Sequence, residues 1–331
     1  MKALTFSLFI LCVYACTTPQ SKEEKPSKVQ LIFDTDFGPD YDDVGAIALV
    51  HAFADSGQVE VLATMASTDY DHVAATLNVF NTYFGRPYIP IGVPRDSAIS
   101  DRDWQGWSDS VTAHYPHHIT SNEQAEDAVA LYRKILAEQP DSSVTIVTVG
   151  FLTNLANLLR TGPDQYSELS GPLLVEKKVK VLVSMAGAIP AGREFNVFKD
   201  GEAAKSTFDS WPTPVIFSGF EIGEKVKTGL PLIANENIKN SPVKDVFALS
   251  IPKADQDSLG RMSWDQTAVL VAIKGAKPYY HLTEGRMVVQ EDGANTWKND
   301  GKGHFYLTEN WTSKQVEHLI NQLMMHQPVK P

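Results

Sequence analysis

The sequence predicts an α/β fold: a single doubly wound, mainly parallel sheet that is flanked by helices and carries a small late β-hairpin. Short apolar runs alternate with segments of helical spacing along most of the chain, as in proteins built on a parallel sheet. We find no internal repeat, and no domain linker after Lys28. The remaining stretch of about 300 residues is long enough for one large α/β domain.

The first half of the chain supplies three strand-like runs and three helical runs. Residues 29–33 are a short apolar run that suits a buried parallel strand. The alternation then continues with a helix at 44–54, a strand at 59–66, a helix at 73–84, a short strand at 89–91 and a helix at 123–139. Segment 94–122 is rich in Trp, Asp, Ser and His and has no clear period, so we predict a long functional loop or lid there.

The second half repeats the pattern and adds the hairpin. Strands are predicted at 143–149, 179–185 and 215–217, and helices at 151–159, 264–273 and 313–325. The Asp292-Gly293 pair favours a tight turn, which predicts a hairpin over 285–297.

The N-terminus has the pattern of an export signal. Lys2 precedes an apolar run that ends at Ala15 and is too short to span a bilayer. Residues 13–16 resemble a bacterial lipobox, in which Cys16 would carry a lipid anchor, although they also suit ordinary signal cleavage. We therefore predict a signal peptide at 1–15, a flexible tether at 16–28 and the folded domain at 29–331. The mature protein would be a periplasmic or outer-membrane-anchored bacterial lipoprotein, or otherwise secreted.

The net charge of the protein indicates which classes of partner it can bind. The formal net charge is −11, whereas a nucleic-acid-binding protein needs a basic face to neutralise phosphates. The sequence thus argues against nucleic acid and is compatible with a neutral or cationic small substrate.

Four polar features follow predicted strands or open predicted helices. They are segments 34–43, 148–150, 185–196 and 264–265. Ligands of open α/β sheets bind beyond the carboxyl ends of the strands, so these features are expected to form one site.

Segment 34–43 places five aspartates within ten residues, between an apolar strand and a helix. Like charges this close repel one another, and a hard cation with oxygen ligands relieves the repulsion. Asp42 and Asp43 would lie at the helix start, where the helix dipole favours anions. The segment therefore predicts a calcium or magnesium site.

The same residues resemble a known family. Asp34-Thr35-Asp36-x-Gly38, followed by Asp42-Asp43, resembles the opening motif of the inosine-uridine-preferring nucleoside hydrolase family. Three further blocks, in the family's order, are similar: 149–156 to Gly-x-Leu-Thr-Asn-x-Ala, 185–204 to its Met-Gly-Gly and Glu-Phe-Asn blocks, and 263–265 to the region of its late Asp. The resemblance implies a nucleoside hydrolase-like domain and cleavage of the N-glycosidic bond between ribose and base.

The resemblance also implies a metal centre. Asp36, Asp43 and Asp265, with the backbone carbonyl of Val149, would bind Ca²⁺. The ion would hold the ribose hydroxyls and one water, and Asp36 would take a proton from that water as catalytic base. As in glycoside hydrolysis generally, the water would attack an anomeric carbon with oxocarbenium character.

The resemblance also implies a set of side chains that contact the substrate. Glu194 and Asn196 would bind sugar hydroxyls. Two extra residues before the Asp pair leave open whether Asp40 or Asp42 binds another hydroxyl. Asp69 stands where many members have an Asn, and it completes the predicted substrate-binding set.

One departure concerns the leaving base. Purine-cleaving members of the family have a His before the late Asp, and this chain has Trp264. Tryptophan cannot protonate a base, although it can stack on one. Candidate replacements lie in segment 94–122: Trp104, Trp107, His114, Tyr115, His117 and His118.

Two other functions remain open from the sequence. A protein that binds a ribosyl compound through a metal without turnover would suit the replacement at Trp264. A metal-dependent phosphohydrolase would instead use Asp34 as nucleophile, since Asp34 and Asp36 form an Asp-x-Asp pair after a strand. The base, the sugar and the oligomeric state are not fixed, although relatives are commonly oligomers.

Overall fold

The computed structural model describes residues 28–95 and 98–328, so the predicted signal peptide and nearly all of the predicted tether lie outside the described residues. Its centre is an 11-stranded sheet with the order β4-β3-β2-β1-β5-β6-β8-β13-β11-β12-β7. The strands from β4 through β13 in this order run parallel, and the last three pair antiparallel. Their bounds are β1 Val29–Thr35, β2 Val59–Ala66, β3 Ile91–Val93, β4 Glu126–Asp127, β5 Val144–Thr148, β6 Val179–Met185, β7 Ala191–Gly192, β8 Val215–Ser218, β11 Tyr280–Val289, β12 Asn295–Lys298 and β13 His304–Glu309.

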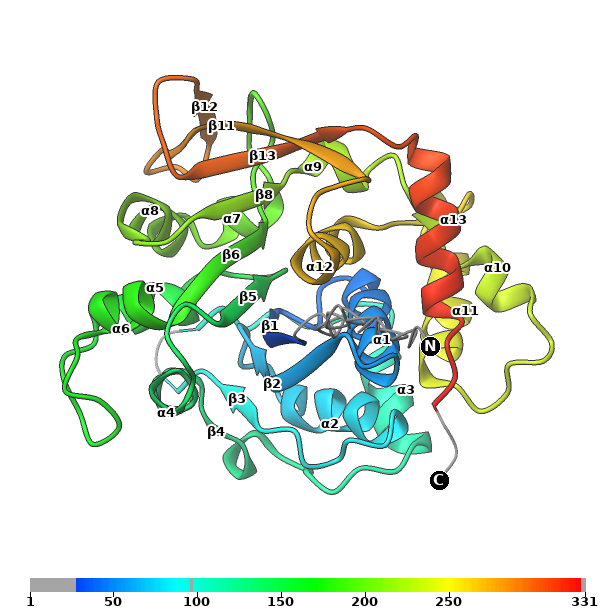
Figure 1. The fold of residues 1–331 in the computed structure, drawn as a ribbon. Coiled ribbons are helices and arrows are strands. Elements are labelled where there is room, and N and C mark those ends of the chain that lie inside the picture. Colours follow the sequence, from blue (N-terminus) through cyan, green and yellow to red (C-terminus); the bar gives the residue numbers. More distant parts are fainter. Residues whose placement is uncertain (1–27, 96–97, 329–331) are drawn as a thin grey trace, which may run out of the picture.

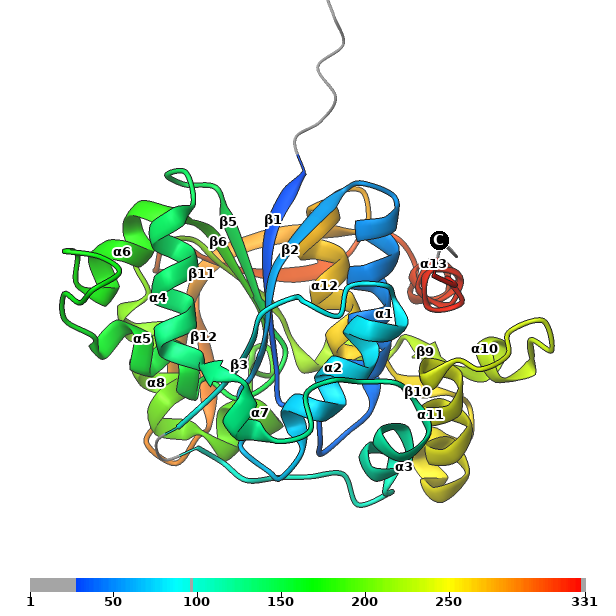
Figure 2. The same ribbon diagram turned by 90° about the horizontal axis from the view of Figure 1, so that it is seen from below.

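Helices cover both faces of this sheet, which confirms the doubly wound α/β prediction (Figures 1 and 2). On one side lie α1 (Asp42–Asp55), α2 (Val73–Tyr83), α12 (Trp264–Lys274) and α13 (Ser313–Met324). On the other side lie α4 (Ala128–Glu138), α5 (Thr153–Arg160), α6 (Gly171–Lys178) and α8 (Gly201–Ser210).

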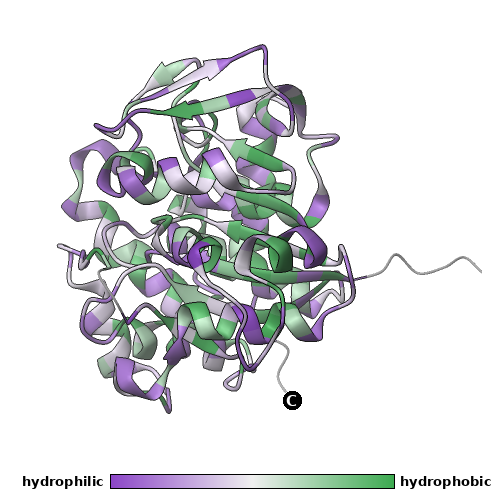
Figure 3. Ribbon diagram, turned by 90° about the vertical axis from the view of Figure 1, so that its left-hand side faces the viewer, coloured by the Kyte–Doolittle hydropathy of each residue, from purple (hydrophilic) through white to green (hydrophobic). Residues whose placement is uncertain are grey.

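Two hydrophobic cores result, one on each face. Along β1, Leu31 and Phe33 belong to the core beneath α1 and α12, whereas Ile32 belongs to the core beneath α4 and α5. Successive side chains of a strand point to opposite faces, so an uninterrupted apolar run serves both layers. Each buried side chain of this size stabilises the fold by roughly 1.5–3 kcal/mol. Figure 3 shows the result, with hydrophobic strands inside and hydrophilic segments at the periphery.

The predicted hairpin is confirmed. Arg286 pairs with Lys298 and Val289 with Asn295, and Gly293 turns the chain at a φ of 76°.

Three predicted elements need correction. The helix predicted at 123–139 begins at Ala128, because the Asp127 carboxylate caps it by accepting from the Ala130 N–H at 2.7 Å. The strand predicted at 89–91 is shifted to 91–93, where Gly92 pairs with Met65. Segment 94–122 is not wholly irregular, since it contains α3 (Trp107–His114), which packs against α2 and begins with the buried Trp107.

A long excursion separates β8 from α12 and was not predicted. It contains α9 (Phe220–Gly223), α10 (Leu230–Ala234), α11 (Pro242–Ser250) and a two-stranded sheet of β9 (Lys227–Thr228) and β10 (Arg261–Met262). The excursion delivers Arg261 and Trp264 to the carboxyl edge of the parallel strands. Within residues 28–95 and 98–328, no helix is both long and apolar enough to cross a bilayer.

Candidate active site

A cavity opens at the carboxyl ends of β1, β5 and β6, where the sequence placed the site. Its lining combines carboxylates from three segments with aromatic and amide side chains. The lining residues are Asp36, Asp40, Asp42, Asp43, Val149, Met185, Glu194, Phe195, Asn196, Phe220, Trp264 and Asp265. Nine of the ten predicted site residues are among them, and the missing one is Asp69.

The acidic segment is held by packing on both sides. Phe37 is fully buried and contacts Phe80 and Trp107 edge-on, with ring centroids at 5.3 and 5.6 Å. Gly38 passes so close to the Asp101 carbonyl and the Tyr70 ring that a Cβ there would lie 2.8 Å from each. The loop between β1 and α1 is therefore closely packed at Phe37 and Gly38, and the aspartates at 36, 40, 42 and 43 line the cavity.

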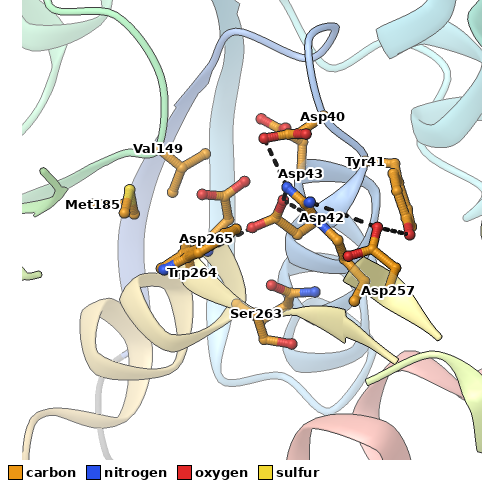
Figure 4. Close-up of polar contacts among 12 residues, drawn as sticks. Asp40, Tyr41, Asp42, Asp43, Val149, Met185, Asp257, Ser263, Trp264 and Asp265 are labelled. Carbon is orange, nitrogen blue, oxygen red and sulfur yellow. Dashed lines mark hydrogen bonds and ion pairs between the residues drawn. The ribbon is translucent and has the colours of Figure 1, made fainter. Parts of the chain in front are cut away.

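Three aspartates could hold a cation together. Asp42 and Asp43 open α1, and Asp265 lies in the first turn of α12. Each offers a carboxylate oxygen within 4.8 Å of the others, and all three are buried. Val149 lies beside this group in Figure 4 and lines the same cavity. Buried carboxylates with a nearby carbonyl suit the oxygen ligation of a hard divalent cation.

The electrostatics of the group fit such an ion. Burial, followed by the charges of Asp43 and Asp40, raises the pKa of Asp36 well above its usual range. Burial and the charge of Asp42 raise the pKa of Asp265 in the same way, and the pKa of Asp43 rises to about 7. Each of these shifts reports a buried negative charge that the protein alone compensates poorly, and a divalent cation would compensate it.

The pH dependence of stability follows from these shifts. The pKa of Asp43 and that of the buried Asp34 are both about 7 in the folded chain, above the ordinary value of 3.8. Between pH 4 and pH 7 the folded state therefore binds more protons than the unfolded state, so stability falls as the pH rises. We expect thermal denaturation in chelator to show a lower midpoint at neutral pH than at pH 5, and millimolar calcium to reverse this loss. A midpoint in chelator that rises towards pH 7 would contradict the expectation.

Asp42 is positioned by an arginine that the sequence reading missed. Arg261 donates to one Asp42 oxygen through Nε at 3.1 Å and through a terminal nitrogen at 2.8 Å. The other Asp42 oxygen accepts from the Asp265 N–H at 3.3 Å. Arg261 also pairs with Asp40 at 2.7 Å and lies near Asp257, and its guanidinium stands 5.1 Å from the ring centroids of Tyr41 and Trp264. Figure 4 shows Asp40, Asp42 and Asp257 converging beside Tyr41.

Glu194 and Asn196 are buried at the opposite wall. The Glu194 carboxylate caps the short helix α7 (Phe195–Lys199) by accepting from the N–H groups of Asn196 and Val197, and it also accepts from Gly187. The Asn196 amide donates to the carbonyls of Val149 and Met185, both at 3.2 Å. Glu194 therefore holds the wall in place, and Asn196 ties it to the Val149 carbonyl.

Aromatic rings line the rest of the cavity. The Trp264 indole N–H donates to the Phe220 carbonyl at 2.8 Å, and the two rings lie 5.1 Å apart at 32°. Phe220 is 37% exposed and Phe195 is 39% exposed. Such rings offer faces for stacking on a flat substrate group.

Asp69 lies apart from this cavity. Its side chain is exposed, and its backbone carbonyl accepts from Asn122. Its role in substrate binding stays a prediction that the structure does not support. We expect Asp69→Ala to change kcat/KM by less than about threefold, as for an ordinary surface substitution. A tenfold rise in KM would restore the sequence-based assignment.

The candidate replacements from segment 94–122 are not among the residues that line the cavity. Trp107 is buried against Phe37, and Trp104 is exposed. His114 and Tyr115 line a separate hollow between α2, α3 and α11, where Tyr115 donates to Asp245 at 2.5 Å. The His117 ring lies beside the Tyr115 carbonyl, and His118 lies against Tyr88.

Asp34 is a structural residue. It is fully buried within β1 and accepts from the Tyr132 hydroxyl at 2.7 Å and from the Asn154 amide at 3.1 Å. Because Asp34 does not line the cavity, the geometry removes the basis for a phosphohydrolase with Asp34 as nucleophile.

Sequence reasoning gave no role to Phe195 and Phe220, which line the cavity, or to Arg261, which pairs with Asp40 and Asp42 of the lining. Phe220 follows the carboxyl end of β8, so the rule that identified the other segments could have found it. Arg261 lies in an excursion without clear periodicity, and its only signal was its position shortly before Trp264-Asp265.

Comparisons with known proteins agree with this geometry. The family model described as inosine-uridine preferring nucleoside hydrolase matches residues 31–316. The pyrimidine-specific ribonucleoside hydrolase RihA of Citrobacter koseri is 31% identical over 233 residues, which are 66% of this chain and 68% of that protein. A plant nucleoside hydrolase, PpNRh1, has the same fold, with a TM-score of 0.68 and 21% identity over 91% of this chain and 99% of that chain. The inosine-uridine preferring nucleoside hydrolase of Bacillus anthracis gives a TM-score of 0.67 at 16% identity, over 90% of this chain and 99% of that chain.

The family match covers the whole sheet, the acidic segment and the late aspartate. The chain therefore belongs to the inosine-uridine preferring nucleoside hydrolase family, and it is an N-ribosyl hydrolase of the glycosidase class.

Proposed function

We propose that this protein is a calcium-dependent hydrolase that cleaves the N-glycosidic bond of nucleosides or related ribosyl compounds. The observation that carries the calcium assignment is the meeting of Asp42, Asp43 and Asp265, which come from two distant segments and bring buried oxygens within 4.8 Å of one another. Calcium accepts several carboxylate and carbonyl oxygens in flexible geometry, which suits this set.

The residues divide the work as follows. Of the three converging aspartates, Asp43 and Asp265 would hold the cation, together with Asp36 and the Val149 carbonyl, while Asp42 stays paired with Arg261. The bound cation would supply a docking point for the ribose diol and would acidify a water. Asp36, buried beside Asp43, takes the proton from the attacking water. The ring of negative charge stabilises the positive charge that develops at the anomeric carbon.

The second hydroxyl contact belongs to Asp40 rather than Asp42. Both Asp42 oxygens already accept hydrogen bonds, from Arg261 and from the Asp265 N–H. The Asp40 side chain is 46% exposed and lines the cavity, so an incoming hydroxyl can reach it. Asn196 would contact the sugar from the opposite wall, and Trp264 with Phe220 would stack on the base.

The assay is a panel of purine and pyrimidine ribonucleosides, with release of free base measured in chelator and after return of calcium or magnesium. We expect base release that chelator stops and calcium restores more fully than magnesium. Full activity in chelator would contradict the metal assignment. Ribose binding without base release would favour the binding protein that the sequence left open.

Export is a further part of the proposal, supported by the sequence of residues 1–28. A lipid-anchored protein would partition into detergent and would lose this property in Cys16→Ser. A soluble periplasmic or secreted product from both forms would favour ordinary signal cleavage. Homo-oligomerisation stays a prediction, which light scattering of the purified protein would decide.

A further inference from the structure

Two neighbouring residues of the acidic segment contact the excursion between β8 and α12. They are Asp40 and Tyr41, the two extra residues that precede the Asp pair in comparison with the family's opening motif. Asp40 pairs with the Arg261 guanidinium at 2.7 Å, and the same guanidinium lies 5.1 Å from the centroid of the Tyr41 ring. The Tyr41 hydroxyl donates to Asp257 at 2.5 Å, as Figure 4 shows. Both extra residues therefore meet the excursion around one arginine.

Three carboxylates compete for this guanidinium. Its Nε and one terminal nitrogen, Nη2, donate to Asp42 at 3.1 and 2.8 Å, and Nη2 also pairs with Asp40. The other terminal nitrogen, Nη1, lies 3.7 Å from Oδ2 of Asp257, which is too long for a hydrogen bond. One positive charge cannot compensate three buried or half-buried carboxylates, so the position of the guanidinium decides which of them it orders.

The Asp257 carboxylate depends on Tyr41 for its hydrogen bonding. It is fully buried, and the oxygen that lies nearest to Nη1, Oδ2, is the one that accepts from the Tyr41 hydroxyl. Its other oxygen, Oδ1, has no hydrogen-bond partner within residues 28–95 and 98–328. Lys227 of β9 acts on this carboxylate through its charge, whereas Tyr41 gives it a hydrogen bond.

Loss of the Tyr41 hydroxyl would shift the balance among the three carboxylates. A buried carboxylate without a hydrogen bond is unfavourable, and Nη1 is a donor that needs to move by less than 1 Å, from 3.7 Å to about 3 Å, to supply one. The guanidinium is planar and rigid, so Nη1 cannot approach Asp257 without moving Nε and Nη2 relative to Asp42 and Asp40.

We propose that Tyr41 is a positioning residue, whose hydroxyl occupies Asp257 and thereby keeps the Arg261 guanidinium on Asp40 and Asp42 at the wall of the cavity. This inference rests on the proposed function, because it assumes that Asp40 meets a sugar hydroxyl there. It gives the two extra residues of the acidic segment one shared role, since Asp40 contacts the sugar and Tyr41 secures the arginine that orders Asp40.

The first test is Tyr41→Phe, which removes the hydroxyl and keeps a ring that is fully buried and packs edge-on against Phe247, with centroids 5.1 Å apart. We expect KM for a ribonucleoside in calcium to rise at least about tenfold, as for a lost hydrogen bond to a charged group, while kcat changes by less than about threefold. Calorimetry should show calcium binding that is unchanged or tighter, because Asp42 is released from the arginine.

A second substitution distinguishes positioning from general damage to the fold. Asp257→Asn removes the charge that attracts Arg261, and a neutral carbonyl binds a guanidinium only about half as strongly as a carboxylate does. We expect KM of Tyr41→Phe/Asp257→Asn to lie within about threefold of that of Asp257→Asn alone, whereas two independent defects would add.

A crystal structure of metal-free Tyr41→Phe gives a readout that needs no turnover. We expect Nη1 of Arg261 at about 3 Å from Asp257 and the contact from Nη2 to Asp40 lost. Tyr115→Phe is the matched control, since the Tyr115 hydroxyl also donates to a carboxylate, that of Asp245 at 2.5 Å, but in the separate hollow away from the cavity. The control should leave KM unchanged.

The outcomes separate this inference from the proposed function. An unchanged KM in Tyr41→Phe, an Arg261 guanidinium that stays on Asp40, or additive defects in the double variant overturns the inference while the proposed function stands. If the parent protein cleaves no riboside under any metal condition, the proposed function fails, and the role of Tyr41 in sugar binding fails with it.

Discussion

Replacing Asp43 with alanine is expected to abolish divalent-cation binding and nucleoside hydrolysis together, with kcat/KM falling at least about 1000-fold. Asp43 interacts with both Asp36 and Asp42, and it offers one of the three converging oxygens, the others coming from Asp42 and Asp265. Without it, the cation loses a central ligand while the repulsion that the cation would compensate is reduced. Both changes lower the affinity of the remaining carboxylates for the cation.

The same substitution is expected to stabilise the protein in the absence of metal. The raised pKa of Asp43 shows that its buried charge is unfavourable in the folded chain. Thermal denaturation in chelator should therefore give a higher midpoint for Asp43→Ala than for the parent, and added calcium should no longer raise it. Calorimetry with calcium and base-release kinetics complete the measurement, with Asp71→Ala as the exposed control. Retained activity together with retained calcium binding would refute the site.

The sheet edge could be predicted because its signals are local. A short apolar run predicts a strand, and a residue directly after that strand lies at the carboxyl edge of the parallel sheet. Asp36 and Val149 directly follow two such runs, and Asn196 belongs to the segment that follows a third; all three line the cavity. Because a parallel sheet brings the carboxyl ends of its strands to the same edge, these positions along the chain are enough to predict one shared site.

Other features depend on long-range packing and have no local signal. Arg261 contacts Asp42 from 219 positions away in the sequence, through an excursion whose helices are short and irregular. Asp69 had the appropriate residue type after a strand, yet the chain turns it outward. The burial of Trp107 in segment 94–122 depends on Phe37 of the acidic loop, which a reading of either segment alone does not show.

Arg261→Met is expected to destabilise the protein by about 3–5 kcal/mol, because it leaves buried carboxylates without their counter-charge. Asp42 and Asp257 have side chains that are 3% and 0% exposed, and both lie near the guanidinium. Methionine preserves much of the packing against Tyr41 and Trp264 but supplies no charge. Urea denaturation in chelator measures the loss. Arg160→Met is the matched control, since Arg160 pairs with Glu202 on the surface and should cost less than about 1 kcal/mol.

Calcium affinity is expected to change in the opposite direction. The positive charge of Arg261 neutralises part of the negative charge of the aspartates and holds Asp42 in an ion pair. Removal of Arg261 therefore leaves Asp42 free to turn towards the cation. Calorimetry should show calcium binding that is unchanged or tighter in Arg261→Met, while kcat/KM falls because Asp40 and Trp264 lose the guanidinium that orders them. Arg261→Lys should recover part of the stability but little of the geometry, since an ammonium cannot donate through two nitrogens to one carboxylate. A variant that loses calcium binding in parallel with stability would show that Arg261 only supports the fold, and a variant that gains affinity while losing turnover would show that it sets the position of Asp42.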